Sequence, residues 1–182
     1  MTRESPARVP MAQLRHHLLR TERIKKILPV LHAESILCSA PQIISNLLET
    51  LSYFPNTDKT PPSVRDVEAW IRILLARAFG ITKKMSECNE QLCIAQRLFE
   101  KDGTQAGCLW ARFHSIYDND NAIGRIHEFQ ELVEKFRDIE DYRGVRKCMF
   151  AIAEIHQRSG QHAQYHTTIL SGLETIVGCL PR

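Results

Sequence analysis

The chain has 182 residues, of which 43% are apolar and 25% charged, a composition typical of a globular domain and unlike that of a disordered or collagen-like chain. Its 24 basic and 21 acidic side chains give a formal charge of +3, which is too small to indicate a dedicated nucleic-acid binder by itself. No apolar run approaches the roughly 20 residues that cross a bilayer, and the first residues lack the apolar stretch of a secretory signal. We therefore expect a cytoplasmic protein, with the nucleus as the alternative compartment.

The first third of the chain predicts helices that are interrupted by prolines. Pro29 ends or kinks the first helix, which starts near residue 11. Ser39, followed by Gln42 three residues later, has the form of a capping box that opens another helix. The stretch 55–62 contains three prolines and cannot continue a helix, so we expect a loop and the main internal boundary there.

Residues 15–26 form a basic segment, with five basic side chains and one acidic one beside an apolar side. A basic amphipathic helix can lie on an anionic membrane, contact phosphates or dock on a partner. More often such a terminal helix covers a neighbouring helix pair and leaves its charges solvated. We therefore expect neither a membrane nor a nucleic acid as partner.

Beyond residue 62, apolar residues recur at steps of three and four, which predicts six helices joined by short polar turns. Ser63 and Asp141 are expected to cap helix starts, and Gly80 and Gly160 are expected to end helices. Short connections force neighbouring helices to run antiparallel. The expected fold is all-α, a right-handed α-solenoid of antiparallel helix pairs with about eight helices in all.

Large aromatic side chains recur along these helices. Trp70, Trp110 and Phe150 follow one another at intervals of 40 residues, and their common phase with Leu and Ile predicts core positions. A two-helix recurrence of about this length is the signature of an α-solenoid. The expected organisation is, in chain order, a flexible N-terminus (1–10), N-terminal helices packing on the array (11–54), a loop (55–62) and three repeats (63–103, 104–140 and 141–178).

In the last of these units Ala153 is followed by His156 and then by Gly160, and this order resembles a degenerate tetratricopeptide repeat. In that family a small residue in the first helix is followed three residues later by an aromatic or planar side chain, and then by a glycine at the turn. Ala153, His156 and Gly160 match in that order, and Met149 stands at the tryptophan position of the family. The units here are about 40 residues long, whereas that family usually has 34. The resemblance implies a scaffold that binds a protein or peptide in a groove lined by the first helices.

In the tetratricopeptide register, one set of side chains in the last unit faces the groove and forms the expected partner-binding site: Lys147, Phe150, Glu154, Gln157 and Arg158. In the middle unit the corresponding residues are Cys108, Ala111 and Ser115. The expected partner is a peptide or a helix of another protein, held by apolar anchors and a few charges. No cofactor is expected.

Two other functions stay open. A regulatory or oligomerisation segment of a larger signalling protein would associate through a repeat end, and it predicts an exposed apolar end near Leu170, Leu173 and Ile176. An all-α enzyme would need a pocket between the N-terminal helices and the array. Its candidate groups are His32, His114 and His156. No nucleophile motif or glycine-rich phosphate loop supports the enzyme.

Metal and disulfide chemistry are not expected. His162 and His166 lie four residues apart and would share a helix face, but the glutamate that follows the first histidine of a zinc HExxH motif is absent. The six cysteines are dispersed and include no CxxC pair. This pattern predicts reduced thiols that mostly act as small buried hydrophobes.

Overall fold

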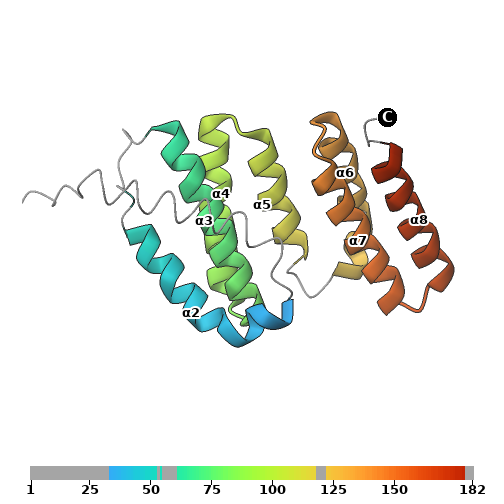
Figure 1. The fold of residues 1–182 in the computed structure, drawn as a ribbon, viewed down its shortest axis with the longest axis horizontal. Helices are drawn as coiled ribbons and strands as arrows, with labels where there is room; N and C mark the ends of the chain where they lie inside the picture. The colour runs from blue at the N-terminus through green and yellow to red at the C-terminus, as the bar shows by residue number, and fades with distance from the viewer. Residues whose placement is uncertain (1–32, 53, 55–60, 118–121, 179–182) are drawn as a thin grey trace, which may run out of the picture. The chain divides into compact units, whose positions relative to one another are not determined.

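The computed structural model describes residues 33–52, 54, 61–117 and 122–178. Within these ranges the chain is all-helical, with seven α-helices, one short 3-10 helix and no strand, so the expected all-α class is confirmed (Figure 1). The expected N-terminal segment 1–10, the first predicted helix and most of the 55–62 loop lie outside the described residues. None of the described helices combines the length and the apolarity that a membrane span needs.

The chain divides into two compact units, Met1–Gln91 and Leu92–Arg182. The division falls inside one helix, α4 (Met85–Asp102). The sequence predicts the main boundary earlier, in the proline-rich 55–62 stretch. Each unit is described below by itself.

In the first unit, α2 (Ala33–Ser52) packs against α3 (Pro62–Ile81). The buried side chains are small or aliphatic, among them Ala40 and Leu47 of α2 and Ile71 and Leu75 of α3. Helices that bury such side chains at three- and four-residue steps expose a polar opposite side, which is the pattern that the sequence shows.

Two helix starts in this unit differ from the sequence prediction. α2 is continuous through Ser39 and Pro41, so the capping box predicted at Ser39 is wrong. α3 begins at Pro62, and the residue before it makes no side-chain capping bond, so the predicted Ser63 cap is also wrong. Proline suits this position because the N–H that it lacks would have no acceptor in the first helical turn.

The second unit continues from α4 with α5 (Gln105–Tyr117), η1 (Ala122–Arg125), α6 (Ile126–Asp138), α7 (Tyr142–Arg158) and α8 (His162–Gly178). α6 packs against α5 and α7. α8 packs against α7, and the two helices lie side by side in Figure 1. The largest fully buried side chains of this unit are Phe99, Ile116, Phe129, Leu132, Phe136, Val145 and Cys148. The predicted cap at Asp141 is confirmed, because its carboxylate accepts the Gly144 N–H at the start of α7.

The turns between these helices share one hydrogen-bond pattern. At the α6–α7 turn, Asp141 N–H donates to the Phe136 carbonyl at 2.9 Å, and Glu140 has a φ of 56°. The α4–α5 turn repeats this pattern, with Thr104 as the donor and Gly103 at a φ of 68°. A residue in the left-handed backbone conformation, followed by a backbone hydrogen bond of this kind, ends a helix and gives its last carbonyl groups a donor. Each pair of helices is thereby folded back as a hairpin.

The same two hairpins also share a packing contact. Gly107, near the start of α5, lies against the ring of Phe99, and Gly144, near the start of α7, lies against the ring of Phe136. The second pair comes 37 residues after the first. A Cβ atom at either glycine would come closer than 3.0 Å to the phenylalanine ring. Glycine therefore allows a closer approach of the two helices than any other residue.

The 40-residue aromatic spacing does not mark equivalent core positions. Trp110 is only 7% exposed and Trp70 is partly buried, but Phe150 is 51% exposed. The prediction that Phe150 belongs to the core is therefore wrong. The reason is that α7 buries a different side, which includes Val145 and Cys148, and this leaves Phe150 at the edge of the α7–α8 contact.

Candidate functional site

One side of α7 presents a row of exposed side chains. Positions along it follow the three- and four-residue steps of a helix face, and we call this row the α7 face: Arg143, Arg146, Lys147, Phe150, Glu154, Gln157 and Arg158. All of them are exposed except Glu154, which is partly buried. The opposite side of α7 carries Val145, Cys148, Ile152 and Ile155, which are buried. The helix is thus amphipathic, with a basic and aromatic outer side.

The start of α7 is held in place by Trp110 of α5. The Trp110 indole N–H donates to Asp141 Oδ2 at 2.8 Å, while Asp141 Oδ1 accepts the Gly144 N–H at 3.1 Å. The Arg143 guanidinium lies over the indole, 5.2 Å from the ring centroid. A cation over an indole face is attracted by the ring quadrupole. The capping carboxylate, the indole and Arg143 therefore act together to orient the first turn of α7.

A second link joins α5 to the far part of the α7 face. The Tyr117 hydroxyl donates to Glu154 Oε2 at 2.9 Å, and the Arg158 guanidinium donates to the other oxygen of the same carboxylate at 2.6 Å. Both oxygens of Glu154 are therefore engaged within the protein. An exposed pair of this kind stabilises the fold by less than about 1 kcal/mol, so its main effect is to position the side chains.

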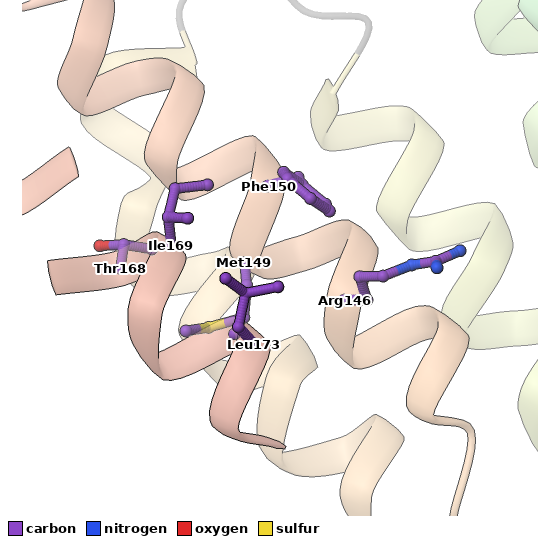
Figure 2. A pocket seen from close by; sticks show the side chains of 7 residues that line it. Arg146, Met149, Phe150, Thr168, Ile169 and Leu173 are labelled. Atoms are coloured by element: carbon purple, nitrogen blue, oxygen red, sulfur yellow. The ribbon is translucent and has the colours of Figure 1, made fainter. Parts of the chain in front are cut away.

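An apolar pocket lies where α7 meets α8, next to the basic part of the α7 face (Figure 2). Its lining residues are Arg146, Met149 and Phe150 of α7 and Thr168, Ile169, Gly172 and Leu173 of α8. Figure 2 shows the guanidinium end of Arg146 directed away from Met149 and Leu173, so only its aliphatic stem contributes to the pocket. Long basic side chains commonly place their stems on apolar surface in this way.

Large apolar side chains around this pocket are exposed to solvent. Besides Phe150, Leu173 is 49% exposed and Leu170 is 60% exposed. The sequence predicts an exposed apolar end near Leu170, Leu173 and Ile176, and this is confirmed for the two leucines, while the Ile176 side chain lies outside the described ones. Apolar side chains that cluster on a surface commonly mark an interaction site.

The predicted partner-binding residues all lie on α7. Lys147, Phe150, Gln157 and Arg158 are exposed, and Glu154 is the acidic residue held by Tyr117 and Arg158. The α8 contribution to the pocket was missed, because periodicity alone does not indicate which helix lies beside Phe150. The apolar end predicted at the leucines of α8 was the sequence signal that could have indicated this contribution.

The predicted groove positions of the preceding unit are only partly exposed. Cys108 and Ser115 are partly exposed, and the Ser115 hydroxyl donates to the Arg112 carbonyl at 2.8 Å within α5. Ala111 is 1% exposed, so its predicted place in a groove is wrong. α5 turns that side toward the core, where Phe113 and Ile116 are also buried.

The histidines do not form a common site in the described part of the chain. His162 and His166 are exposed on α8, and no group of three metal-binding side chains occurs among the described residues. His156 is within 2.6 Å of Gln161 Oε1. His114 is buried beside Trp110. The α7–α8 pocket contains none of these side chains, and His32 lies outside the described residues.

Four cysteines have described side chains, and all four are free thiols. Cys88 and Cys148 are buried, Cys108 is partly exposed and Cys93 is exposed. Burial, together with the nearby Asp141 carboxylate, raises the pKa of Cys148 to about 12, and burial also raises the pKa of Cys108. A thiol with a raised pKa is a poor nucleophile, because the thiolate is the reactive form. The prediction of buried thiols is confirmed for Cys88 and Cys148 but not for Cys93.

Comparison with known proteins does not assign the chain to a family. A scan against protein-family models finds no match, and searches of curated proteins and of solved structures find none either. The resemblance of Ala153, His156 and Gly160 to a tetratricopeptide repeat therefore stays a sequence-based prediction.

Proposed function

We propose that this chain is a protein-interaction scaffold that holds a peptide or a helix of a partner protein against the α7 face and the α7–α8 pocket. The observation that carries the proposal is the half-exposed Phe150 at the edge of an apolar pocket. Each 100 Å² of apolar surface removed from water contributes on the order of 2.5 kcal/mol, so covering this side chain is favourable.

The surroundings of Phe150 have the features of an interface hot spot. An aromatic anchor beside an apolar pocket, bordered by arginine and other polar side chains, is the arrangement in which a few residues carry most of the binding free energy. Here the border is formed by Arg146, Lys147 and the Tyr117–Glu154–Arg158 link. The link engages Glu154 before any partner arrives, which lowers the entropy lost on binding.

The matched Phe–Gly contacts of the two hairpins support a helical-repeat scaffold as the setting for this site. In such scaffolds, neighbouring helices present a continuous surface to an extended or helical partner. We place the protein in the cytoplasm, with the nucleus as the alternative compartment, and the proposal needs no cofactor.

A photo-crosslinking experiment tests this proposal. A benzophenone amino acid replaces Phe150 in the full chain, and a matched protein carries the same group at Gln130, an exposed position of α6. In the native cell we expect position 150 to crosslink to a discrete partner polypeptide, and we expect the product to be lost when Leu173→Glu is added. Equal products from both positions, or none from position 150, would contradict the proposal.

The exposed Leu170 favours a second candidate, in which α8 joins two copies of the chain as an oligomerisation segment. The same experiment separates the two, because a crosslinked product with twice the mass of the chain indicates self-association. Sedimentation of the purified protein provides an independent check. A monomer at high concentration would exclude this second candidate.

A further inference from the structure

We propose that the partner of the α7 face is an acidic amphipathic segment, with apolar side chains for the α7–α8 pocket and carboxylates for the basic side chains beside it. This inference rests on the proposed function and adds the chemistry of the partner. It is carried by the charge of α7 and by the place of that charge next to the pocket.

The α7 helix is strongly basic. It contains four basic side chains and one acidic side chain, and three of the basic ones, Arg143, Arg146 and Lys147, lie in its first two turns. All three are exposed. The single acid, Glu154, is already engaged by Arg158 and by Tyr117. The first two turns of α7 therefore present a positive surface.

The neighbouring acids make no ion pair with Arg146. Asp141 uses one carboxylate oxygen for the Gly144 N–H and the other for the Trp110 indole. Glu140 is exposed, and among the described residues neither it nor Arg146 has an ion-pair partner. The carboxylates closest in sequence are thus used for capping or directed to solvent, and Arg146 stays available to a partner.

The α8 side of the pocket adds little charge. This helix contains no lysine or arginine, and its one acid is Glu174, which follows Leu173. His162 and His166 are exposed on the same helix. The positive charge beside the pocket therefore comes from α7.

The placement of charge and pocket constrains the partner. The aliphatic stem of Arg146 lines the pocket, and its guanidinium points away from the pocket. Lys147 lies about one helical turn before Phe150. We consider a helical partner with an apolar anchor residue in the pocket. The partner's residues within about one helical turn of that anchor then lie next to these cations. Carboxylates at those partner positions gain charge complementarity, which favours the correct partner and speeds association.

A nucleic acid is the competing ligand for a basic and aromatic surface. The pocket, however, is lined mainly by aliphatic and thioether groups, with Phe150 as the aromatic side chain. Nucleic-acid sites usually combine a longer row of cations with several stacking side chains. We therefore assign the surface to an acidic protein segment and treat nucleic acid as an outcome of the test.

The test is a peptide selection on the full chain. A display library of random peptides of about 16 residues, long enough for about four helical turns, is selected on the wild-type protein and, in parallel, on Phe150→Glu. We expect peptides that require Phe150 to be net acidic and to carry two or more large apolar residues at three- or four-residue steps. Enriched peptides are then measured by fluorescence anisotropy.

Charge-reversal variants test the role of the cations directly. In Arg146→Glu/Lys147→Glu the enriched peptide should bind about tenfold more weakly or worse, while the matched double variant Lys135→Glu/Arg137→Glu on α6 should bind within about twofold of wild type. Raising the salt from about 50 to about 300 mM should weaken binding to the wild-type protein several-fold, because exposed charges are screened.

The outcomes separate the two proposals. Neutral or basic peptides that still require Phe150 would overturn the acidic partner and leave the scaffold function standing. A library without any Phe150-dependent peptide would count against both. Displacement of the enriched peptide by an equimolar single-stranded RNA would also overturn the inference, in favour of a nucleic-acid ligand.

Discussion

Replacing the glycines of the two matched hairpins by alanine tests the packing of the second unit most directly. In Gly107→Ala and Gly144→Ala, the new methyl group would overlap the ring of Phe99 or Phe136, closer than 3.0 Å. Both rings are fully buried, so neither can move into solvent to make room. We therefore expect each substitution to destabilise the unit, although alanine normally favours a helix.

The size of the effect follows from two opposing contributions. Overpacking of a buried contact costs about 1–3 kcal/mol, whereas exchanging glycine for alanine within a helix gains at most about 1 kcal/mol. The gain is reduced here because both glycines lie in the first turn of their helices. The expected net loss is about 1–2 kcal/mol for each substitution, which for a chain of this length lowers Tm by roughly 2–8 °C.

Urea unfolding followed by tryptophan fluorescence measures this loss, since Trp110 is buried within the same unit. Gly172→Ala in α8 is the matched control, because its Cβ would be 3.4 Å from the nearest atom, an ordinary contact with Met149. It should leave the stability unchanged or raise it slightly. Adding Phe136→Leu to Gly144→Ala should recover part of the loss, as a double-mutant cycle would show. A Gly144→Ala protein as stable as wild type would refute the close-packed contact.

Three further predictions concern α7. Asp141→Ala should lower the free energy of unfolding by about 1–3 kcal/mol, because a helix cap and a charged hydrogen bond are lost together. Trp110→Phe removes buried packing as well as the shared hydrogen bond, so in chemical denaturation the double variant should lose less stability than the sum of the two single variants. A fully additive result would contradict the shared role of the carboxylate. Cys148, whose pKa is raised from 9.0 to about 12, binds its proton more tightly in the folded state. The free energy of unfolding should therefore fall as pH rises from about 9 to about 12, by at most about 1.4 kcal/mol per pH unit. In thermal unfolding, the stability of Cys148→Ala should depend less steeply on pH than that of the wild type. Identical slopes of stability against pH for the two proteins would disprove this. The double variant Lys147→Glu/Arg158→Glu should change the free energy of unfolding by less than about 0.5 kcal/mol, since both side chains are exposed. It should nevertheless reduce the crosslinking yield at position 150. An unchanged yield would show that these two residues do not belong to the site.

Much of the helical organisation was accessible from local chemistry. Apolar residues at three- and four-residue steps predicted the all-α class, and an aspartate before such a run identified the α7 cap at Asp141. Gly160 marked the α7–α8 turn correctly, where its φ is 71°. These features depend on interactions between residues close in sequence, so the sequence contains the information for them.

Other local signals were overruled by the rest of the chain. Pro41 lies inside the continuous α2, although proline usually ends a helix. Lys83 and Glu140 take the left-handed conformation at turns where glycine is the common residue. In both cases a local preference of one to a few kcal/mol is smaller than the contribution of packing the adjoining helices.

The candidate site shows the same division between local pattern and packing. The spacing of apolar residues predicted that Trp110, Ala111 and Phe150 lie on apolar or groove-facing sides of their helices. It did not indicate which neighbouring helix covers each side. Trp110 and Ala111 are buried within the second unit, whereas Phe150 meets only the edge of α8 and stays half exposed. Periodicity specifies the direction of a side chain about its own helix axis. Whether that side becomes core or surface is decided by contacts with residues far away in the chain, which no local pattern encodes.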